Sequence, residues 1–175
     1  MTLAADHGSQ WLGGWWASEK LDGCRAYWDG CQFWTRGGNI ITAPRWFTQG
    51  LPDVHLDGEI WAGRKGFQDA SKAVRLGGKW FETPGLEFVA FDAPQVNGTW
   101  PKRMAEAARA VAKASCAVAV AFSRVNDALW TGNRNDLAEM LLRFSRLGSE
   151  GLMFRNPDAN GYETGRSKNL LRVKF

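Results

Sequence analysis

The segment from Ser18 to Arg25 holds a lysine, a carboxylate, a glycine and an arginine within a few residues. Lys20 can act as a nucleophile once its amine is deprotonated, and Asp22 can orient or activate a reacting group. Gly23 permits a sharp bend or a close approach to a ligand. Arg25 presents a fixed fork of donors suited to phosphate or to a ribose hydroxyl. Taken alone, such a string is more often a solvated turn, because Asp-Gly is a common turn pair.

Two further segments carry charge in unusual positions. Glu59 lies between Gly58 and Ile60 in a short apolar run, where an inward carboxylate would need a ligand or partner. An outward-facing strand glutamate is the alternative. The last twelve residues, 164–175, contain four lysines and arginines and no acidic residue, which equals the net charge of +4 of the whole chain. This end either faces phosphates or is an ordinary charged terminus.

The composition is that of one domain with a substantial core. The chain has 175 residues, of which 45% are apolar, and its ten Trp and ten Phe offer packing or base-stacking surface. The charge of +4 does not by itself indicate nucleic-acid binding. Three cysteines without a Cys-x-x-Cys pair argue against a zinc site or a disulfide framework. No run approaches a membrane span, and no secretory leader is visible.

Apolar periodicity and turn signals predict the elements that must position these side chains. We expect strands at 15–18, 24–28, 31–35, 56–61, 86–91, 116–122, 150–154 and 170–175, and helices at 44–50, 66–75, 101–115 and 136–147. Asp29-Gly30 predicts a hairpin with a two-residue turn, which would hold Arg25 on a rigid strand. Residues 1–14 are expected to form a loose lead-in. Because no regular βαβ rhythm is present, we expect an α+β fold with antiparallel sheets flanked by helices.

Six short motifs follow one another along the chain. They are Lys20–Arg25, Thr35–Gly38, Leu56–Glu59, Phe88–Asp92, Glu150–Met153 and Leu171–Lys174. In order and rough spacing, this series resembles the nucleotidyltransferase motifs of ATP-dependent DNA ligases and mRNA capping enzymes. Segments 18–30, 43–51, 56–67 and 150–171 look like the small bacterial DNA ligases called Lig E. The resemblance extends over nearly the whole chain from Trp15 onward.

The resemblance implies a nucleotidyltransferase domain of the ligase and capping-enzyme kind, which is ATP-grasp-like. In this family a lysine attacks the α-phosphate of ATP to form lysyl-AMP, and AMP then moves to the 5′-phosphate of a nick. The 3′-hydroxyl attacks last and expels AMP. Lys20 matches the nucleophile, and Asp22 would assist nick sealing. The implied partners are ATP, Mg²⁺ or Mn²⁺, and nicked double-stranded DNA, in replication or repair, for a monomer without membrane association.

The resemblance also implies nucleotide-binding roles. Arg25 and Glu59 match residues that hold the ribose, and Phe91 matches the aromatic residue that stacks on adenine. Arg25 and Lys174 are candidates to clamp the α-phosphate and to act in catalysis. The complete set expected to bind the cofactor is Glu19, Arg25, Glu59, Phe91, Arg172 and Lys174.

Metal and DNA contacts are implied in the same way. Glu150, together with Glu59, matches carboxylates near a catalytic metal, and Mg²⁺ suits carboxylate and phosphate oxygens. Arg36 matches a residue that binds the 5′-phosphate of the nick. Arg172 stands where the family usually carries lysine, which keeps the charge but changes the geometry. Thr35 stands where the small ligases usually carry serine.

The sequence ends at Phe175, where the last motif ends and the family normally continues into an oligonucleotide-binding (OB) barrel. We therefore expect one adenylation domain, residues 1–175, without that barrel. Self-adenylation should be slow or absent, sealing of a pre-adenylated nick weak, and DNA binding weak and salt-sensitive. The alternatives are an RNA ligase or capping-type nucleotidyltransferase, and a nucleotide- or DNA-binding module without turnover. The compartment stays open between cytoplasm and periplasm, where small ligases of this type often reside.

Overall fold

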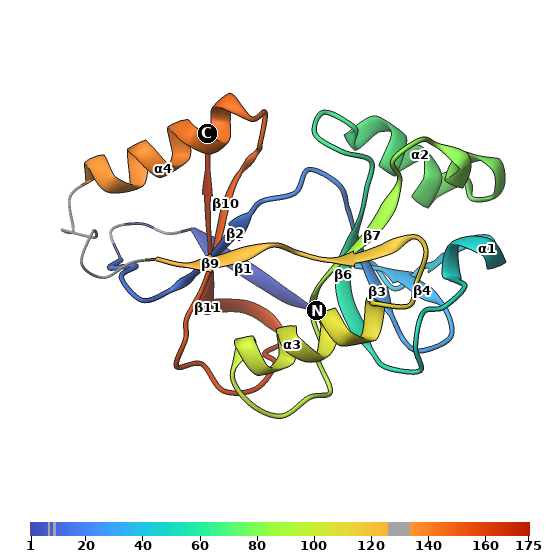
Figure 1. Cartoon of the computed structure of the whole chain (residues 1–175), viewed down its shortest axis with the longest axis horizontal. Coiled ribbons are helices and arrows are strands. Elements are labelled where there is room, and N and C mark those ends of the chain that lie inside the picture. Colours follow the sequence, from blue (N-terminus) through green and yellow to red (C-terminus); the bar gives the residue numbers. More distant parts are fainter. Residues whose placement is uncertain (7, 9, 126–133) are drawn as a thin grey trace.

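The computed structural model describes residues 1–6, 8, 10–125 and 134–175, with the side chains of 134–136 left out. Within this part of the chain, two β-sheets lie side by side (Figure 1). Sheet A has the strand order β1 (Thr2–Asp6), β11 (Gly165–Lys174), β10 (Gly151–Arg155), β2 (Trp16–Glu19) and β9 (Phe122–Arg124). Sheet B has the order β5 (Ile40–Ile41), β4 (Phe33–Thr35), β3 (Cys24–Trp28), β6 (Leu56–Trp61), β7 (Glu87–Asp92) and β8 (Ala117–Ala119).

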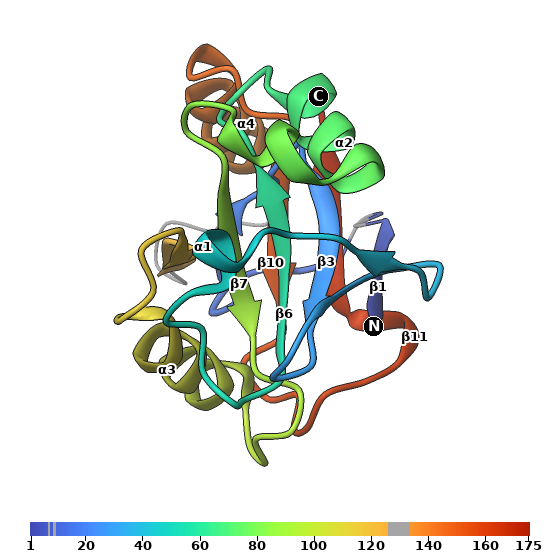
Figure 2. The same ribbon diagram turned by 90° about the vertical axis from the view of Figure 1, so that its right-hand side faces the viewer.

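Helices surround the two sheets. They are α1 (Arg45–Thr48), α2 (Phe67–Leu76), α3 (Trp100–Val111), α4 (Arg134–Arg146) and the 3₁₀ helix η1 (Gly78–Glu82). Figure 2 shows β3, β6 and β7 side by side, with α2 near one end of these strands and α3 near the other. The α+β class with largely antiparallel sheets is therefore confirmed, and β1–β11 and β7–β8 are parallel pairs among the described strands. No helix among the described residues is long and apolar enough to cross a membrane.

Each sheet has its own hydrophobic core. In sheet B the rings of Phe33 and Phe88 lie 4.8 Å apart, and those of Phe47 and Phe81 are also 4.8 Å apart. These contacts place much of the aromatic content of the sequence in packing, where each ring buries a large apolar area. Sheet A packs a smaller cluster, including Leu152, against the apolar face of α4.

Two expectations about the N-terminal half are wrong. Residues 2–6 are not a loose lead-in but form β1, which pairs with β11 some 160 residues away. The hairpin after β3 also has a longer connection, because Trp28 pairs with Phe33 and leaves residues 29–32 in the loop. The Asp29 carboxylate accepts hydrogen bonds from the amides of Cys31 and Gln32, which stabilises the longer loop.

The expected strand at 116–122 is two strands in different sheets. Ala117–Ala119 extends sheet B, and Phe122–Arg124 extends sheet A, so the chain passes from one sheet to the other between them. An apolar run predicts a buried extended segment but not the sheet to which each part belongs. Helix α3 also ends at Val111, earlier than the expected Ser115.

Candidate active site

A pocket of about 260 Å³ opens between the two sheets, and both sheets line it. Sheet A contributes Ser18 and Met153, and sheet B contributes Arg25, Glu59 and Phe91. The lining therefore brings together residues from motifs that are more than 130 positions apart in the sequence.

Strand alternation explains why charged side chains face this pocket. On β6, Leu56 and Ile60 are fully buried in the core of sheet B. Because successive side chains point to opposite faces of a sheet, Asp57 and Glu59 face the other way, toward the pocket. On β3, Ala26 lies in the core, which turns its neighbour Arg25 toward the same face.

Phe91 reaches the pocket wall through a β-bulge. Asp57 pairs with Asp92 and Gly58 pairs with Ala90, so Phe91 is the extra residue on β7. A bulge of this kind redirects a side chain. The guanidinium carbon of Arg25 lies 4.6 Å from the centre of the Phe91 ring, within the range of a cation–π contact.

Lys20 follows β2 directly and meets Glu150 from the other end of the sequence. The Lys20 amine donates to one oxygen of Glu150, and the Lys174 amine lies 2.5 Å from the other oxygen. Burial raises the pKa of Glu150, but the hydrogen bonds from Lys174 and Lys20 outweigh this and hold it below its ordinary value. Gly151, with φ of 154°, allows β10 to approach β11 closely here, because a Cβ would lie 2.0 Å from the Val173 carbonyl oxygen.

Glu59 approaches the same region from sheet B. The Gly23 amide donates to Glu59 Oε1 at 2.9 Å, and a Cβ on Gly23 would lie only 2.5 Å from the carbonyl oxygen of Ile60. Burial raises the pKa of Glu59 to about 7, although the Gly23 hydrogen bond and the charges of Arg25 and Lys20 oppose the shift. Glu59 is therefore an inward carboxylate with partners, which was one of the two readings of its sequence position.

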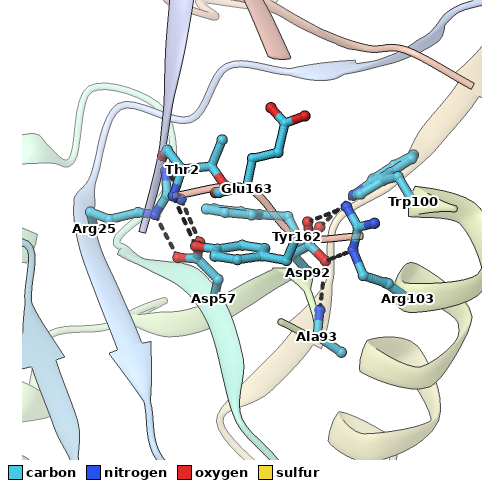
Figure 3. Close-up of polar contacts among 10 residues, drawn as sticks. Thr2, Arg25, Asp57, Asp92, Ala93, Trp100, Arg103, Tyr162 and Glu163 are labelled. Atoms are coloured by element: carbon cyan, nitrogen blue, oxygen red, sulfur yellow. Dashed lines mark hydrogen bonds and ion pairs between the residues drawn. The ribbon is translucent and has the colours of Figure 1, made fainter. Parts of the chain in front are cut away.

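Asp57 is a functional candidate that the sequence reasoning did not single out. Its carboxylate is fully buried and accepts from Arg25 Nε at 2.6 Å and from Arg25 Nη2 at 2.5 Å (Figure 3). The Tyr162 hydroxyl donates to Asp57 Oδ2 at 2.5 Å. The sequence signal for Asp57 was its position two residues before Glu59, because side chains two apart on a strand lie on the same face.

A second buried ion pair closes the pocket near α3. Arg103 donates from Nε to Asp92 Oδ1 at 2.7 Å and from Nη2 to Oδ2 at 3.1 Å. Burial raises the pKa of Asp92, against the hydrogen bonds and charge of Arg103. Arg103 Nη1 also donates to the carbonyl oxygens of Gly98 and Gly161, each at 2.8 Å. Arg103 therefore ties α3 to β7 and to the loop that carries Tyr162.

Arg155 also lines the pocket and was missed from the sequence. It is 7% exposed, and its Nη1 donates to Ser18 Oγ at 2.9 Å. Its guanidinium carbon lies 4.5 Å from the centre of the Trp100 ring and 5.7 Å from that of Phe91. Burial lowers the pKa of Arg155 to about 10. Nothing in the sequence around Arg155, a basic residue at the end of a buried strand, indicates that its side chain lines a pocket.

Two further sequence candidates are Glu19, which lines the pocket, and Asp22, which does not. The Glu19 carboxylate is held by Arg64, which donates at 2.8 and 2.7 Å, so this side chain is engaged in an ion pair. Asp22 lies on the loop after Lys20 but is not among the described residues that line the pocket.

The remaining basic candidates lie at the rim. Arg36 is exposed on the turn between β4 and β5 and lines the pocket. Arg172 also lines it, and its Nε donates to Asp6 of β1 at 2.7 Å. Lys174 reaches the site through Glu150.

The donor set limits how a metal can be held. The described residues include no cluster of three or more His, Cys, Asp or Glu side chains that could hold a metal ion. Glu59 and Glu150, however, both interact with Lys20, one from each sheet. Mg²⁺ commonly binds through one or two protein carboxylates together with substrate phosphates, and this pair fits that mode.

Comparisons with known proteins point in one direction. No family model matches the chain. A DNA ligase of Haemophilus influenzae is 29% identical over 176 residues, which cover 99% of this chain and 63% of that ligase. A solved Lig E DNA ligase has a TM-score of 0.84 at 31% identity, covering 100% of this chain and 68% of that one. The Chlorella virus DNA ligase-adenylate has a TM-score of 0.76 at 24% identity, covering 99% and 66%.

The two-sheet fold and the pocket between its sheets define a nucleotidyltransferase domain of the DNA ligase class. The similarity to the Chlorella virus enzyme establishes the fold. The whole-length similarity at 31% identity goes further, and the chain belongs to the Lig E family of DNA ligases. It spans 63% of the length of the curated ligase that it matches.

Proposed function

We propose that this chain is the adenylating and nick-joining domain of an ATP-dependent DNA ligase, with Lys20 as the nucleophile. The observation that carries the proposal is the position of the Lys20 amine. It is held by Glu150 beside a pocket that also presents Arg25, Glu59 and Phe91. Lys174, the other lysine of the six motifs, is more exposed.

In the proposed first step, the neutral Lys20 amine forms a bond from Nζ to the α-phosphorus of ATP, and the bond from this phosphorus to the pyrophosphate oxygen breaks. Pyrophosphate leaves, and the proton that Nζ loses passes to solvent. The low pKa of Glu150 supports a role as a permanent anion at neutral pH, one that orients the amine. Arg25 and Lys174 are placed to offset negative charge that develops on the α-phosphate. Lys174 contacts the same Glu150 carboxylate as Lys20, and Arg25 lines the same pocket as Lys20, which supports this assignment.

The nucleotide would occupy the pocket between the sheets. Phe91 offers a ring in the pocket wall for adenine, and Arg25 with Glu59 offers donors and acceptors for the ribose. Glu59 and Glu150 would hold Mg²⁺ or Mn²⁺, which supplies positive charge to the phosphates. Because the Glu19 carboxylate is held by Arg64, we propose that Glu19 contributes through its main chain.

The later steps require DNA. AMP would pass from Lys20 to the 5′-phosphate of a nick, and the 3′-hydroxyl would then form the phosphodiester bond and release AMP. Arg36 and Arg172 at the pocket rim are placed to contact phosphate, and Asp22 lies on the same loop as Lys20. Nicked double-stranded DNA is the proposed partner.

Intact mass spectrometry after incubation with ATP and Mg²⁺ tests the nucleophile. We expect slow addition of one AMP to the wild type and none to Lys20→Ala. Lys72→Ala is the matched control, because Lys72 is an exposed lysine on α2 that pairs with Asp69 outside the pocket. Parallel incubation with GTP separates a ligase from a capping-type enzyme, which would accept guanylate.

A wild type that stays unlabelled is then given a pre-adenylated nicked duplex. Joining that depends on the pocket residues would retain the ligase proposal with an impaired first step. Absence of both labelling and joining would overturn it in favour of a module that binds nucleotide or DNA without turnover. Equal labelling of wild type and Lys20→Ala would also reject Lys20.

A further inference from the structure

The Tyr162 hydroxyl lies between a buried carboxylate and the N-terminal strand. It donates to Asp57 Oδ2 at 2.5 Å and accepts from the amide of Thr2 at 2.9 Å. Figure 3 shows the Tyr162 ring reaching from the loop before β11 toward Asp57 and Arg25. Burial, followed by the charge of Asp57, raises the pKa of Tyr162, so the phenol stays protonated and acts as a donor.

Asp57 has its hydrogen-bonding capacity divided between two partners. Oδ1 accepts from Arg25 Nε, and Oδ2 accepts from both Arg25 Nη2 and Tyr162. Since Asp57 is fully buried, water cannot replace a lost partner. The hydrogen bond from Tyr162 therefore sets the orientation of the Asp57 carboxylate. The orientation of this carboxylate in turn determines where the Arg25 guanidinium lies.

The loop that carries Tyr162 is itself fixed. Arg103 of α3 donates to the carbonyl oxygen of Gly161, directly before Tyr162, at 2.8 Å. Thr2 adds a carbonyl oxygen that accepts from Arg25 Nη2 at 3.2 Å. Arg25 Nε and Nη2 are thus committed to protein partners. Nη1 makes no hydrogen bond to the described part of the chain, which leaves this group for a ligand of the pocket.

We propose that Tyr162 is a positioning residue that acts through Asp57 to hold Arg25 in the orientation needed to contact the nucleotide. The inference rests on the proposed function for what Arg25 does, but the coupling of Tyr162 to Arg25 is a property of the ligand-free protein. This positioning role accounts for the contact between Tyr162 and the β3–β6 strand pair, from which Tyr162 is distant in the sequence.

Tyr162→Phe is the test variant, because it keeps the ring and removes only the hydroxyl. Tyr27→Phe is the matched control. Tyr27 is the other tyrosine of the chain and lies two residues from Arg25 on β3, but its hydroxyl contacts His55 Nδ1 at 2.9 Å. Both variants remove one hydroxyl from one partly buried tyrosine on the same side of the molecule.

The first measurement needs no ligand. Solvent exchange of the arginine Nε–H protons is followed by NMR, with the Arg25 signal assigned from Arg25→Lys and Arg103 as internal reference. Hydrogen-bonded groups exchange slowly, so Tyr162→Phe should accelerate exchange at Arg25 by roughly tenfold and leave Arg103 unchanged. Tyr27→Phe should alter neither. Unchanged exchange at Arg25 in Tyr162→Phe, or equal acceleration at both arginines, would overturn the proposal.

The second measurement is the rate of AMP addition in a double-mutant cycle. Tyr162→Phe should lower the rate roughly tenfold to a hundredfold in the wild-type background and about twofold or less in Arg25→Lys. Equal losses in both backgrounds would show that Tyr162 does not act through Arg25. If NMR shows the coupling but the wild type accepts no AMP and joins no nick, the proposed function fails and the positioning role stands.

Discussion

Two glutamates beside Lys20 have opposite pKa shifts for identifiable reasons. Glu150 is partly exposed and accepts from two lysine amines, so its pKa lies below the ordinary value. Glu59 is partly buried with one amide donor, and burial raises its pKa to about 7. Burial and nearby charge thus give the two glutamates different behaviour. Glu150 stays an anion, and Glu59 titrates near neutral pH. The first suits orientation of the amine, and the second would make the proposed binding of nucleotide and metal depend on pH.

Glu59 also makes stability depend on pH. Its pKa is about 7 in the folded protein and near 4.5 as a free side chain, so the folded state binds the extra proton between these values. The contribution of Glu59 to the free energy of unfolding therefore falls as pH rises from about 5 to about 8. The expected loss is on the order of 3 kcal/mol.

Glu59→Gln should remove this slope in urea unfolding measured from pH 5 to pH 8. The amide keeps an oxygen that can accept from Gly23, so the hydrogen bond is retained. Exposed Glu139 on α4 supplies the control, and Glu139→Gln should unfold with the wild-type pH dependence. If the wild type and Glu59→Gln run parallel across this range, the carboxyl does not titrate there.

Arg155 should recognise the base. It is buried beside Phe91 with one described hydrogen bond, to Ser18, and so retains donors for the ring nitrogens of adenine. We expect Arg155→Met to weaken ATP binding at least tenfold in calorimetry and to leave ribose 5-triphosphate binding unchanged. Because a buried cation is replaced by an apolar side chain, the free energy of unfolding should not fall. Equal weakening of both ligands would place Arg155 at the phosphates or in the scaffold.

At the scale of elements, one buried ion pair attaches α3 to sheet B. Arg103 and Asp92 are 5% and 7% exposed, so Arg103→Ala leaves the Asp92 carboxylate in the core without its ion-pair partner and with the hydrogen bond from the Ala93 amide. We expect a loss of about 3–5 kcal/mol in urea unfolding. Arg109→Ala on the same helix removes an exposed pair with Glu106 and should cost less than about 1 kcal/mol. Similar losses for the two variants would show that the buried pair is not what holds α3.

Elements with a local signal could be predicted from the sequence. The expected strand at 56–61 coincides with β6, and the helix expected at 66–75 is shifted by one residue from α2. β1 could not be predicted, since its short run of small residues becomes a strand only by pairing with β11. The division of 116–122 into β8 and β9 likewise depends on which sheet edge each half meets.

The residues of the site also differ in whether the sequence alone reveals them. Lys20 and Glu59 stand out by residue type and by their neighbours in the sequence. The Tyr162 hydroxyl and the Arg155 guanidinium have partners 105 and 137 positions away, and such contacts leave no mark on a single sequence. The sequence pattern therefore does not reveal residues such as Tyr162 and Arg155, whose contacts are made over long distances in the sequence.

At the scale of the whole molecule, the proposed nucleophile Lys20 lies where the chain passes between the sheets. Lys20–Gly23 connects β2 of sheet A to β3 of sheet B, and Glu150 precedes β10 of sheet A. Glu59 and Phe91 belong to sheet B. A nucleotide bound between them would contact both sheets, so the site depends on the assembled pair and not on either sheet alone.

The proposed DNA binding also depends on the whole molecule, because the proposed phosphate contacts come from both sheets. Arg36, between β4 and β5 of sheet B, and Arg172, on β11 of sheet A, both line the pocket. We expect Arg36→Ala to weaken binding of a nicked duplex with a 5′-phosphate and to lower the salt slope by about one. A nick with a 5′-hydroxyl should bind wild type and variant equally.

The control is Arg45→Ala, which removes an exposed arginine on α1 that does not line the pocket. It should leave binding of both duplexes near the wild-type value when measured by fluorescence anisotropy across a salt series. An Arg36→Ala variant that loses affinity for the 5′-hydroxyl duplex as well would act through general charge. In that case Arg36 would have no specific contact with the nick phosphate.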